Sequence, residues 1–351
     1  MSDLLKILEN EPKFRQKQIF QAWFDLHIKN YNDITTLPKN LREKLQDLDW
    51  LSVETFAIQE SKKDETVKAL LELADKNKIE TVLMGRTDKK EDKIRYTICI
   101  STQVGCPMKC LFCATGKLGL KRNLSFEEIV DQVRFWQRYL ADNFSSGGEE
   151  DNIISNIVLM GQGEPLLNYD NVKKALNIIL DNTAIGHNHI TLSSVGIPEV
   201  MEKLITDKDF PPIRFALSLH SAISSTRSKL LPSQSKDFLD FFVVWSKKYH
   251  QRFSSRAHFI SLEYVMLQNL NDSDKDLKAL IQFISKIGNV RVNLIPFNSI
   301  CGAEISGSSQ EVIQKWQEKI AQAGFYCTIR KSQGTDIDAA CGQLALKSSE
   351  S

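Results

Sequence analysis

Three cysteines lie close together in the 351-residue chain, in the segment Cys106-Pro-Met-Lys-Cys110-Leu-Phe-Cys113. Their CxxxCxxC spacing lets one loop present three thiolates to three irons of a [4Fe–4S] cluster. The fourth iron would stay open, and an open iron can chelate the amino and carboxylate groups of S-adenosylmethionine. The spacing therefore predicts two cofactors, an iron–sulfur cluster held by Cys106, Cys110 and Cys113, and S-adenosylmethionine (SAM).

Two other kinds of site could use these cysteines. A structural zinc ion requires four ligands, usually supplied as CxxC pairs, but no fourth ligand is evident nearby and the loop contains no histidine. Buried core cysteines would not explain three of them in so short a segment. A zinc-stabilised RNA-binding module remains the non-enzymatic alternative, and iron and sulfide analysis separates the two.

A further cysteine lies near the C-terminus. Cys341 occurs in the segment Asp336-Ile-Asp-Ala-Ala-Cys-Gly-Gln343, and Gly342 permits a mobile turn beside it. A thiol on a flexible tail can enter a pocket as a nucleophile; the alternative is a small apolar residue. Cys99 lies shortly before the cysteine cluster, and a core position is its alternative. The remaining two cysteines, Cys301 and Cys327, are assigned to the core.

The composition is that of a folded globular protein, with 42% hydrophobic and 25% charged residues and a net charge of +1. No stretch approaches the roughly 20 apolar residues of a membrane span, and the N-terminal residues do not form a signal peptide. We therefore expect a cytoplasmic protein without a membrane segment. RNA contact would require local basic patches, such as Lys117, Lys121 and Arg122, for which solvated surface is the alternative.

The elements that position these residues alternate from Tyr96 onward. Strands are predicted at Tyr96–Ser101, Ile154–Met160, His189–Ser194, Ile213–Leu219, Phe259–Met266 and Val290–Pro296. Helices are predicted at Phe126–Leu140, Tyr169–Leu180, Pro198–Ile205, Phe238–Tyr249, Ser273–Ile287 and Glu311–Ala323, two of them with capping boxes that begin at Ser125 and Ser308. About six β–α units in series predict a parallel sheet, as a partial or full barrel or a doubly wound sheet.

Polar residues follow the carboxyl ends of the predicted strands, where sites form in such folds. They are Gly161-Gln-Gly-Glu-Pro165, Ser193, Ser218-Leu-His220 and Pro296-Phe-Asn298. The glycines let the backbone approach a ligand, and Glu164 or a backbone carbonyl can bind the amino group of methionine. Ser193, Ser218 and Asn298 suit hydrogen bonds to ribose or carboxylate, although such residues are usually turn formers. His220 could equally be structural.

The chain before Tyr96 has a different pattern. Phe14–Phe24 and the segment after Leu37 predict helices, and Val67–Leu73 with Ile79–Met84 predict a hairpin. We therefore predict a small N-terminal helical plus hairpin domain over residues 1–92, a core over 93–335, and a C-terminal tail over 336–351.

Together these motifs resemble the RlmN/Cfr family of radical-SAM RNA methyltransferases, RlmN type, nearly end to end. The similarity is carried by Phe14-Arg-x-Lys17, Leu37-Pro-Lys, Ile79-Glu-Thr-Val82, the cysteine cluster, Gly161 to Asn168, Ser218-Leu-His220, Glu263-Tyr-Val-Met266, Asn293 to Asn298 and Asp336 to Leu344. Pro165 resembles the RlmN branch rather than Cfr, which methylates carbon-8. Gln162 stands where the family commonly has Met, and Leu231–Lys236 lacks the family's usual pattern.

The resemblance implies a partial (β/α)6 radical-SAM barrel that methylates carbon-2 of adenine in 23S ribosomal RNA and in tRNA, next to the anticodon. One SAM methylates Cys341. A second is cleaved to a 5′-deoxyadenosyl radical, which takes a hydrogen from the methyl group, and the methylene radical adds to carbon-2. Cys99 then releases the RNA through a transient disulfide with Cys341, and Glu80 is the proton acceptor.

The resemblance also implies further contacts and partners. The N-terminal domain over residues 1–92 would contribute to RNA binding. SAM would be bound by Gly163, Glu164, Ser193, Ser218, Leu219, His220 and Asn298. An electron donor such as flavodoxin and a monomeric state are expected. The alternatives are a carbon-8 methyltransferase and a radical-SAM enzyme acting on a protein or a small molecule. Carbon-2 of adenine is electron-poor, so a carbon radical can add where ordinary methyl transfer would fail.

Overall fold

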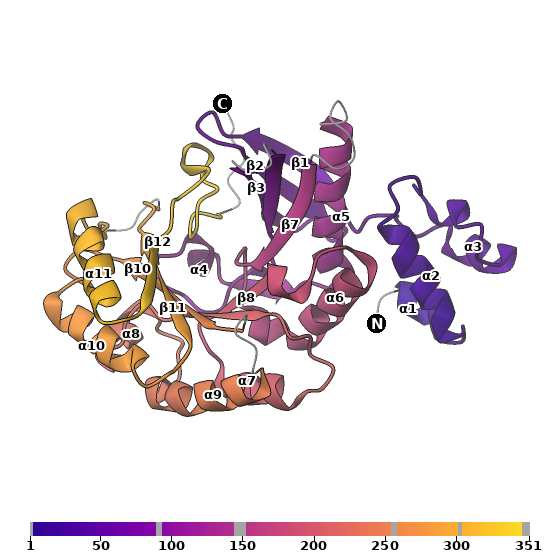
Figure 1. Ribbon diagram of the computed structural model, residues 1–351. Coiled ribbons are helices and arrows are strands. Elements are labelled where there is room, and N and C mark those ends of the chain that lie inside the picture. The colour runs from indigo at the N-terminus through magenta and orange to yellow at the C-terminus, as the bar shows by residue number, and fades with distance from the viewer. Residues whose placement is uncertain (1–2, 89–92, 144–151, 254–257, 301–303, 346–351) are drawn as a thin grey trace.

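The computed structural model describes residues 3–88, 93–143, 152–253, 258–300 and 304–345. The molecule contains one large sheet with helices along its outer face and a separate group of short helices at the N-terminus (Figure 1). These N-terminal elements are α1 (Asp3–Leu8), α2 (Lys13–Trp23), η1 (Tyr31–Asp33) and α3 (Lys39–Leu45). The two predicted N-terminal helices are thereby confirmed as α2 and α3.

One buried arginine joins the N-terminal helices to the core. Arg134 lies on α5 (Phe126–Asn143), donates a 3.0 Å hydrogen bond to the carbonyl of Trp23, and stacks over the rings of Trp23 and Trp50. Asp131, one turn earlier, forms an ion pair with it. An isolated guanidinium would be costly in such a position, so these contacts fix the helices against α5.

The first four strands are antiparallel. They are β1 (Val53–Glu60), β2 (Thr66–Leu73), β3 (Lys78–Asp88) and β4 (Lys93–Cys99), in that spatial order. The predicted hairpin is confirmed as β2 and β3, whereas β1 was not predicted. It is an edge strand that leaves Phe56 and Ile58 exposed, so its sequence lacks a clear alternation of buried and exposed residues.

The parallel part of the sheet begins at β4. It continues with β7 (Asn152–Leu159), β8 (Ile190–Ser194), β9 (Arg214–Ser218), β10 (Ile260–Met266), β11 (Val290–Pro296) and β12 (Tyr326–Ile329). All six predicted strands are present, and β12 adds a further one. Within the described residues β1 and β12 lie at opposite edges, so the sheet is an open, partial barrel. This confirms the predicted α/β class.

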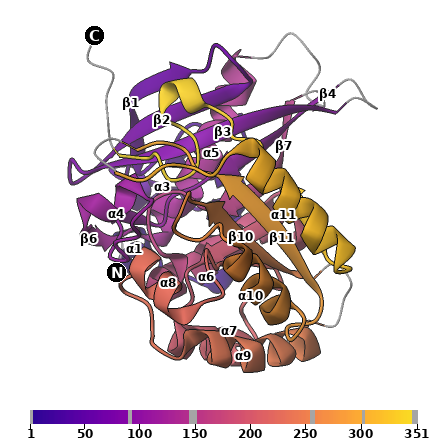
Figure 2. The ribbon, with the colours of Figure 1, turned by 90° about the vertical axis from the view of Figure 1, so that its left-hand side faces the viewer.

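Helices connect the parallel strands and cover their outer face (Figure 2). They are α5, α6 (Tyr169–Asn182), α7 (Pro198–Thr206), α8 (Ser224–Leu230), α9 (Phe238–Arg252), α10 (Asp274–Ile284) and α11 (Gln310–Gln322). The capping box at Ser125 is confirmed, but α11 begins after Ser309, because the Ser308 hydroxyl bonds to Asp272 instead. None of the helices in the described ranges is long and apolar enough to cross a membrane.

Short elements surround the cysteine cluster. β5 (Gln103–Gly105) pairs with β6 (Leu120–Asn123), and α4 (Ala114–Leu118) lies between them in the chain. Other single turns are η2 (Pro165–Asn168), η3 (His187–His189) and η4 (Thr335–Ile337). The β5–β6 pair closes the segment on itself, so residues 106–113, hereafter the cluster loop, form a loop with a fixed base.

Candidate active site

A cavity opens among the loops that follow the carboxyl ends of the parallel strands. The space among these loops amounts to about 960 Å³, part of it open to solvent. Ten of the predicted site residues line it: Cys106, Cys110, Cys113, Gly163, Glu164, Ser193, Ser218, His220, Asn298 and Cys341. The other three, Cys99, Glu80 and Leu219, lie outside its lining.

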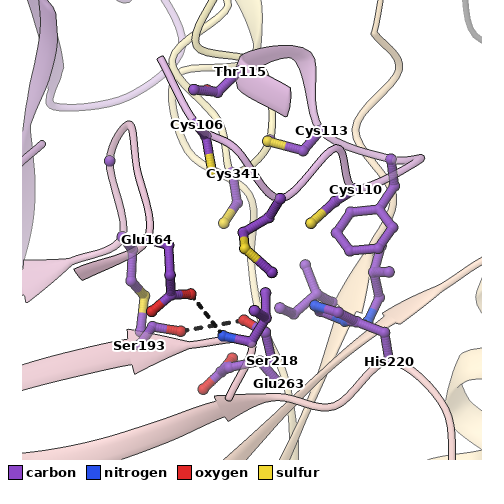
Figure 3. A pocket seen from close by; sticks show the side chains of 18 of the residues that line it. Cys106, Cys110, Cys113, Thr115, Glu164, Ser193, Ser218, His220, Glu263 and Cys341 are labelled. Carbon is purple, nitrogen blue, oxygen red and sulfur yellow. Dashed lines mark hydrogen bonds between the residues drawn. The ribbon is translucent and has the colours of Figure 1, made fainter. Parts of the chain in front are cut away.

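The cluster loop presents its three cysteines to this cavity, and Figure 3 shows their sulfur atoms facing a common space. α4 packs tightly against the loop, because a side chain at Gly116 would come within 3.0 Å of the Cys110 nitrogen. Burial raises the pKa of Cys106 to about 12 and raises the pKa of Cys110, and neighbouring thiols of the same loop raise both further. Holding cysteines of this loop as thiolates, the form that binds iron, therefore requires a positively charged partner.

The arrangement fits an iron–sulfur cluster better than a single metal ion. In the part of the chain that the structure describes, no three His, Cys, Asp or Glu side chains converge closely enough to hold one ion. A zinc ion would need its ligands to meet at one point, about 2.3 Å from each sulfur. Cluster cysteines each bind a different iron and can stand farther apart. The backbone N–H groups of Met108 and Gly163 also lower the pKa of Cys106 and would stabilise its thiolate.

The loop after β7 depends on one glycine and one carboxylate. Gly163 has φ of +107°, and a side chain there would come within 2.7 Å of Gln103. Glu164 is 2% exposed and accepts hydrogen bonds from the backbone nitrogens of Leu166, at 3.0 Å, and Val195, at 2.9 Å. Burial raises the pKa of this carboxyl group. Glu164 therefore joins the loops after β7 and β8 at the cavity wall.

The ends of β8 and β9 place three polar side chains at the cavity. The hydroxyls of Ser193 and Ser218 are 3.4 Å apart, and the His220 ring packs edge-on against Phe112. His220 Nδ1 accepts a 3.0 Å hydrogen bond from the backbone nitrogen of Val265. Burial, followed by the Arg227 charge, lowers the pKa of His220 to about 3. The ring is therefore neutral and carries its proton on Nε2, which can donate to a ligand.

Leu219 contributes through its backbone, because its side chain is buried in the core. Its nitrogen donates a 3.0 Å hydrogen bond to the carbonyl of Glu263. Arg227 completes this wall and was not predicted: it is fully buried and donates to the carbonyls of Leu219 and Val195, at 3.0 and 2.6 Å. The sequence offered one signal that Arg227 is buried: it follows Ile223 by four residues and so lies on the apolar face of α8.

The C-terminal tail reaches back into the cavity. The carbonyl of Gly342 accepts a 2.8 Å hydrogen bond from the nitrogen of Ala114, and the Asn298 amide donates to the carbonyl of Cys341 at 3.1 Å. These contacts turn the Cys341 sulfur toward the three cysteines of the cluster loop (Figure 3). The surrounding protein raises the pKa of Cys341, while the Arg330 guanidinium lowers it.

The two predicted catalytic residues outside the cavity lining lie behind its wall. Cys99 ends β4 and packs against a small cluster formed by Val82 of β3 and by Ala339 and Leu344 of the tail. Burial raises the pKa of its thiol to about 12, and the nearby Cys341 thiol contributes to that rise. Glu80 is a buried residue of β3 and forms an ion pair with Lys68. Both residues therefore lie near the tail rather than in the open part of the cavity.

Glu263 at the cavity wall was noted only as part of a motif. It is the one charged residue of β10, a strand that is otherwise mostly apolar, and this charge was the signal available in the sequence. It accepts a 2.7 Å hydrogen bond from the Asn293 amide and forms an ion pair with Arg330, at 3.4 Å. Glu263 raises and Arg330 lowers the pKa of Cys341, so the pair sets the electrostatic surroundings of that thiol.

One of the three members of the predicted basic patch is ion-paired within the protein. Arg122 pairs with Asp75 at 2.6 Å and with both oxygens of Glu128 at 2.8 Å, so its charge is already compensated. These contacts join the β2–β3 turn to the beginning of α5. Cys327 is half-buried on β12 and is not among the cavity residues, and Cys301 lies outside the described residues.

Comparison with known proteins agrees with this geometry. Residues 100–280 match the Radical SAM superfamily. The chain is 37% identical over 349 residues to a protein of Chlorobium phaeobacteroides described as a probable dual-specificity RNA methyltransferase RlmN, covering 97% of this chain and 91% of the relative. A crystal structure of a radical SAM methyltransferase from Sphaerobacter thermophilus superposes with a TM-score of 0.85 at 31% identity, covering 98% of this chain and 97% of the other.

Proposed function

Since the chain belongs to the RlmN family of radical-SAM RNA methyltransferases, we propose that it methylates carbon-2 of adenine in 23S ribosomal RNA and in the tRNA anticodon loop. The family makes the protein an enzyme that uses a [4Fe–4S] cluster and SAM and acts on RNA. The proposal adds the position on the base, the two classes of RNA, and the use of two SAM molecules per turnover. Pro165 favours this reaction over carbon-8 methylation.

One observation carries the proposal: the tail holds Cys341 against the cavity that the cluster cysteines line. Cofactor binding alone would not require a fourth thiol at this place. A thiol beside the SAM site can accept a methyl group by ordinary displacement, with its sulfur as the nucleophile. The methylated sulfur would then face the place where the second SAM is bound.

When bound, the cluster would supply the electron for cleavage of the carbon–sulfur bond of SAM. The wall of the cavity would orient that SAM. Gly163 allows close backbone approach, Ser193, Ser218 and Asn298 offer polar side chains, and His220 offers its Nε2–H. Leu219 would act indirectly, because its backbone bonds to Glu263 and Arg227 fix the end of β9. Glu164 would shape the wall, and because it lines the cavity its carboxylate could bind the amino group of SAM.

The tail and the strands behind it would complete the reaction. The methyl group on Cys341 becomes the one-carbon bridge to the base, which must leave its stack to reach the cavity. Glu80 accepts the proton lost from carbon-2, and the unpaired electron left on the adduct by the radical addition would return to the cluster. The Cys99 sulfur then attacks the Cys341 sulfur, the bond from that sulfur to the bridging carbon breaks, and a disulfide forms while the bridging carbon becomes a methyl group by taking a proton. The packing of Cys99 against the tail supports this pairing.

Nucleoside mass spectrometry tests the proposal. RNA from a strain that lacks the gene should lose 2-methyladenosine from 23S ribosomal RNA and from tRNA, and expression of the intact gene should restore it. Loss of 8-methyladenosine instead would show the carbon-8 reaction. Unchanged adenosines in both RNAs would contradict the proposed substrate.

A further inference from the structure

A buried ion pair links β2 and β3, the two strands of the N-terminal hairpin. Lys68 on β2 lies opposite Val82 on β3, so Glu80 is its diagonal neighbour on the same face of the sheet. Their charged atoms are 3.1 Å apart, and the side chains are 3% and 1% exposed. Ions so deep in a protein are tolerated only when each remains paired, because removing one partner leaves an uncompensated buried charge.

The ammonium group of Lys68 also reaches the tail. It donates a 3.4 Å hydrogen bond to the carbonyl of Asp338, three residues before Cys341. An ammonium has three donors, so it can bind the carboxylate and this carbonyl together. The same stretch of tail is also held by the connection between β1 and β2, where Asp336 accepts from the Ser61 hydroxyl at 2.7 Å and from the Lys62 nitrogen at 2.9 Å.

Glu80 is held from the cavity side as well. The amide of Gln162 donates to its carboxylate at 3.5 Å and accepts from its backbone nitrogen at 3.4 Å. Gln162 precedes Gly163 and Glu164, which line the cavity. The Glu80 carboxylate therefore lies between the tail that carries Cys341 and the loop that forms the cavity wall, and Lys68 is the cation that holds it there.

We propose that Lys68 is a positioning residue that holds the Glu80 carboxylate in place beneath the Cys341 tail, so that Glu80 can take the proton from the RNA adduct. This inference rests on the proposed function, in which Glu80 is the proton acceptor. In that step the carbon–hydrogen bond at carbon-2 breaks, the proton passes to an oxygen of Glu80, and the electron pair stays on the adduct. Lys68 keeps its own protons throughout.

The inference separates early from late steps of the reaction. Methylation of Cys341 and formation of the RNA adduct do not use Glu80, whereas release of the adduct does. Lys68→Met should therefore leave the mass increase of the Cys341 peptide unchanged. The covalent protein–RNA species should accumulate on a denaturing gel, as with Glu80→Gln, and release of methylated RNA should slow by about 100-fold, a typical contribution of a general base. Lys68→Arg, which keeps the cation, should release RNA faster than Lys68→Met.

A second readout does not depend on turnover. Lys68→Met leaves a buried carboxylate unpaired, so it should lower the unfolding temperature, and the double variant Lys68→Met with Glu80→Gln should unfold at a higher temperature than Lys68→Met alone. Lys248→Met is the matched control, because Lys248 forms an exposed ion pair with Glu202 on the outer helices. It should behave as the wild type in every assay.

Three results would overturn the inference while leaving the proposed function intact. The first is release of RNA by Lys68→Met at the wild-type rate. The second is an equal loss of Cys341 methylation and of adduct formation in Lys68→Met, which would mark a purely structural role. The third is a double variant that is no more stable than Lys68→Met. A wild-type enzyme that makes no 2-methyladenosine would instead overturn the proposed function, and the inference with it.

Discussion

The backbone nitrogen of Ala114 donates a 2.8 Å hydrogen bond to the carbonyl of Gly342. The residue after the last cysteine of the cluster loop is thus bonded to the residue after Cys341. One residue farther on, the Thr115 hydroxyl donates to the carbonyl of Leu344, also at 2.8 Å. The tail therefore takes its position from the cluster loop, and the methyl carrier and the cofactor site should move together.

Removing one of these anchors should loosen the tail. Thr115→Val keeps the shape of the buried side chain but loses the donor to Leu344, at a cost of about 1 kcal/mol. Hydrogen exchange of tail amides should become faster and RNA methylation slower, with unchanged iron content. Thr183→Val is the control, because Thr183 makes a similar 2.8 Å bond to the Ile179 carbonyl at the end of α6. Equal tail exchange in the two variants would show that Thr115 does not anchor the tail.

The cofactor can be tested by composition. Protein reconstituted without oxygen should be brown and contain about four iron and four sulfide ions per chain. Cys106→Ala should lose the cluster and all cleavage of SAM, since each cysteine binds its own iron. Cys327→Ala should keep both, because Cys327 is not among the cavity residues. Zinc without sulfide in the active wild-type protein would point to the RNA-binding module instead.

The neutral state of His220 predicts how stability changes with pH. Burial and the Arg227 charge lower the pKa of His220 from 6.5 to about 3, so below pH 6.5 the unfolded chain binds a proton that the folded chain does not. The neutral His220 ring makes its full contribution to the free energy of unfolding above pH 6.5, the pKa of histidine in the unfolded chain. Below that pH the contribution falls by about 1.4 kcal/mol per pH unit. His220→Asn suits the positive φ of 54° and keeps an acceptor near the Nδ1 position.

Unfolding temperatures of the holoenzyme, measured from about pH 7.5 down to about pH 5.5, check this prediction. The wild type should lose stability relative to His220→Asn as the pH falls through this range. Parallel curves for the two proteins would mean that the buried ring titrates as it does in the unfolded chain.

The cavity wall was predictable to a large extent from local patterns. The cysteine spacing identifies the cluster loop directly. Ser193, Ser218 and Asn298 were predicted to lie together because they follow strands of one parallel sheet, whose carboxyl ends meet. Strand boundaries followed from short apolar runs between amphipathic helices. β1 was missed because an exposed edge strand has no buried face to create a periodic pattern.

The contacts that organise the site were not predictable, because they join distant parts of the chain. The Thr115–Leu344 bond spans 229 residues, and the Lys68–Asp338 bond spans 270. Arg227 could be suspected from its place on an apolar helix face, but its carbonyl partners could not be identified. Lys68 is a charged residue in a strand whose other buried residues are mostly apolar, and its partners depend on strand register and on the path of the tail.

The central claim concerns the two cysteines outside the cluster loop, and Cys99→Ala tests it most directly. This variant can still be methylated on Cys341 and can still join to RNA, but it has no second thiol to release the product. A denaturing gel should show a shifted protein band that ribonuclease collapses. Peptide mass spectrometry should then find adenosine linked through one carbon to the Cys341 peptide, and Cys341→Ala should give no such band. Normal turnover by Cys99→Ala, or an adduct on another residue, would contradict the account.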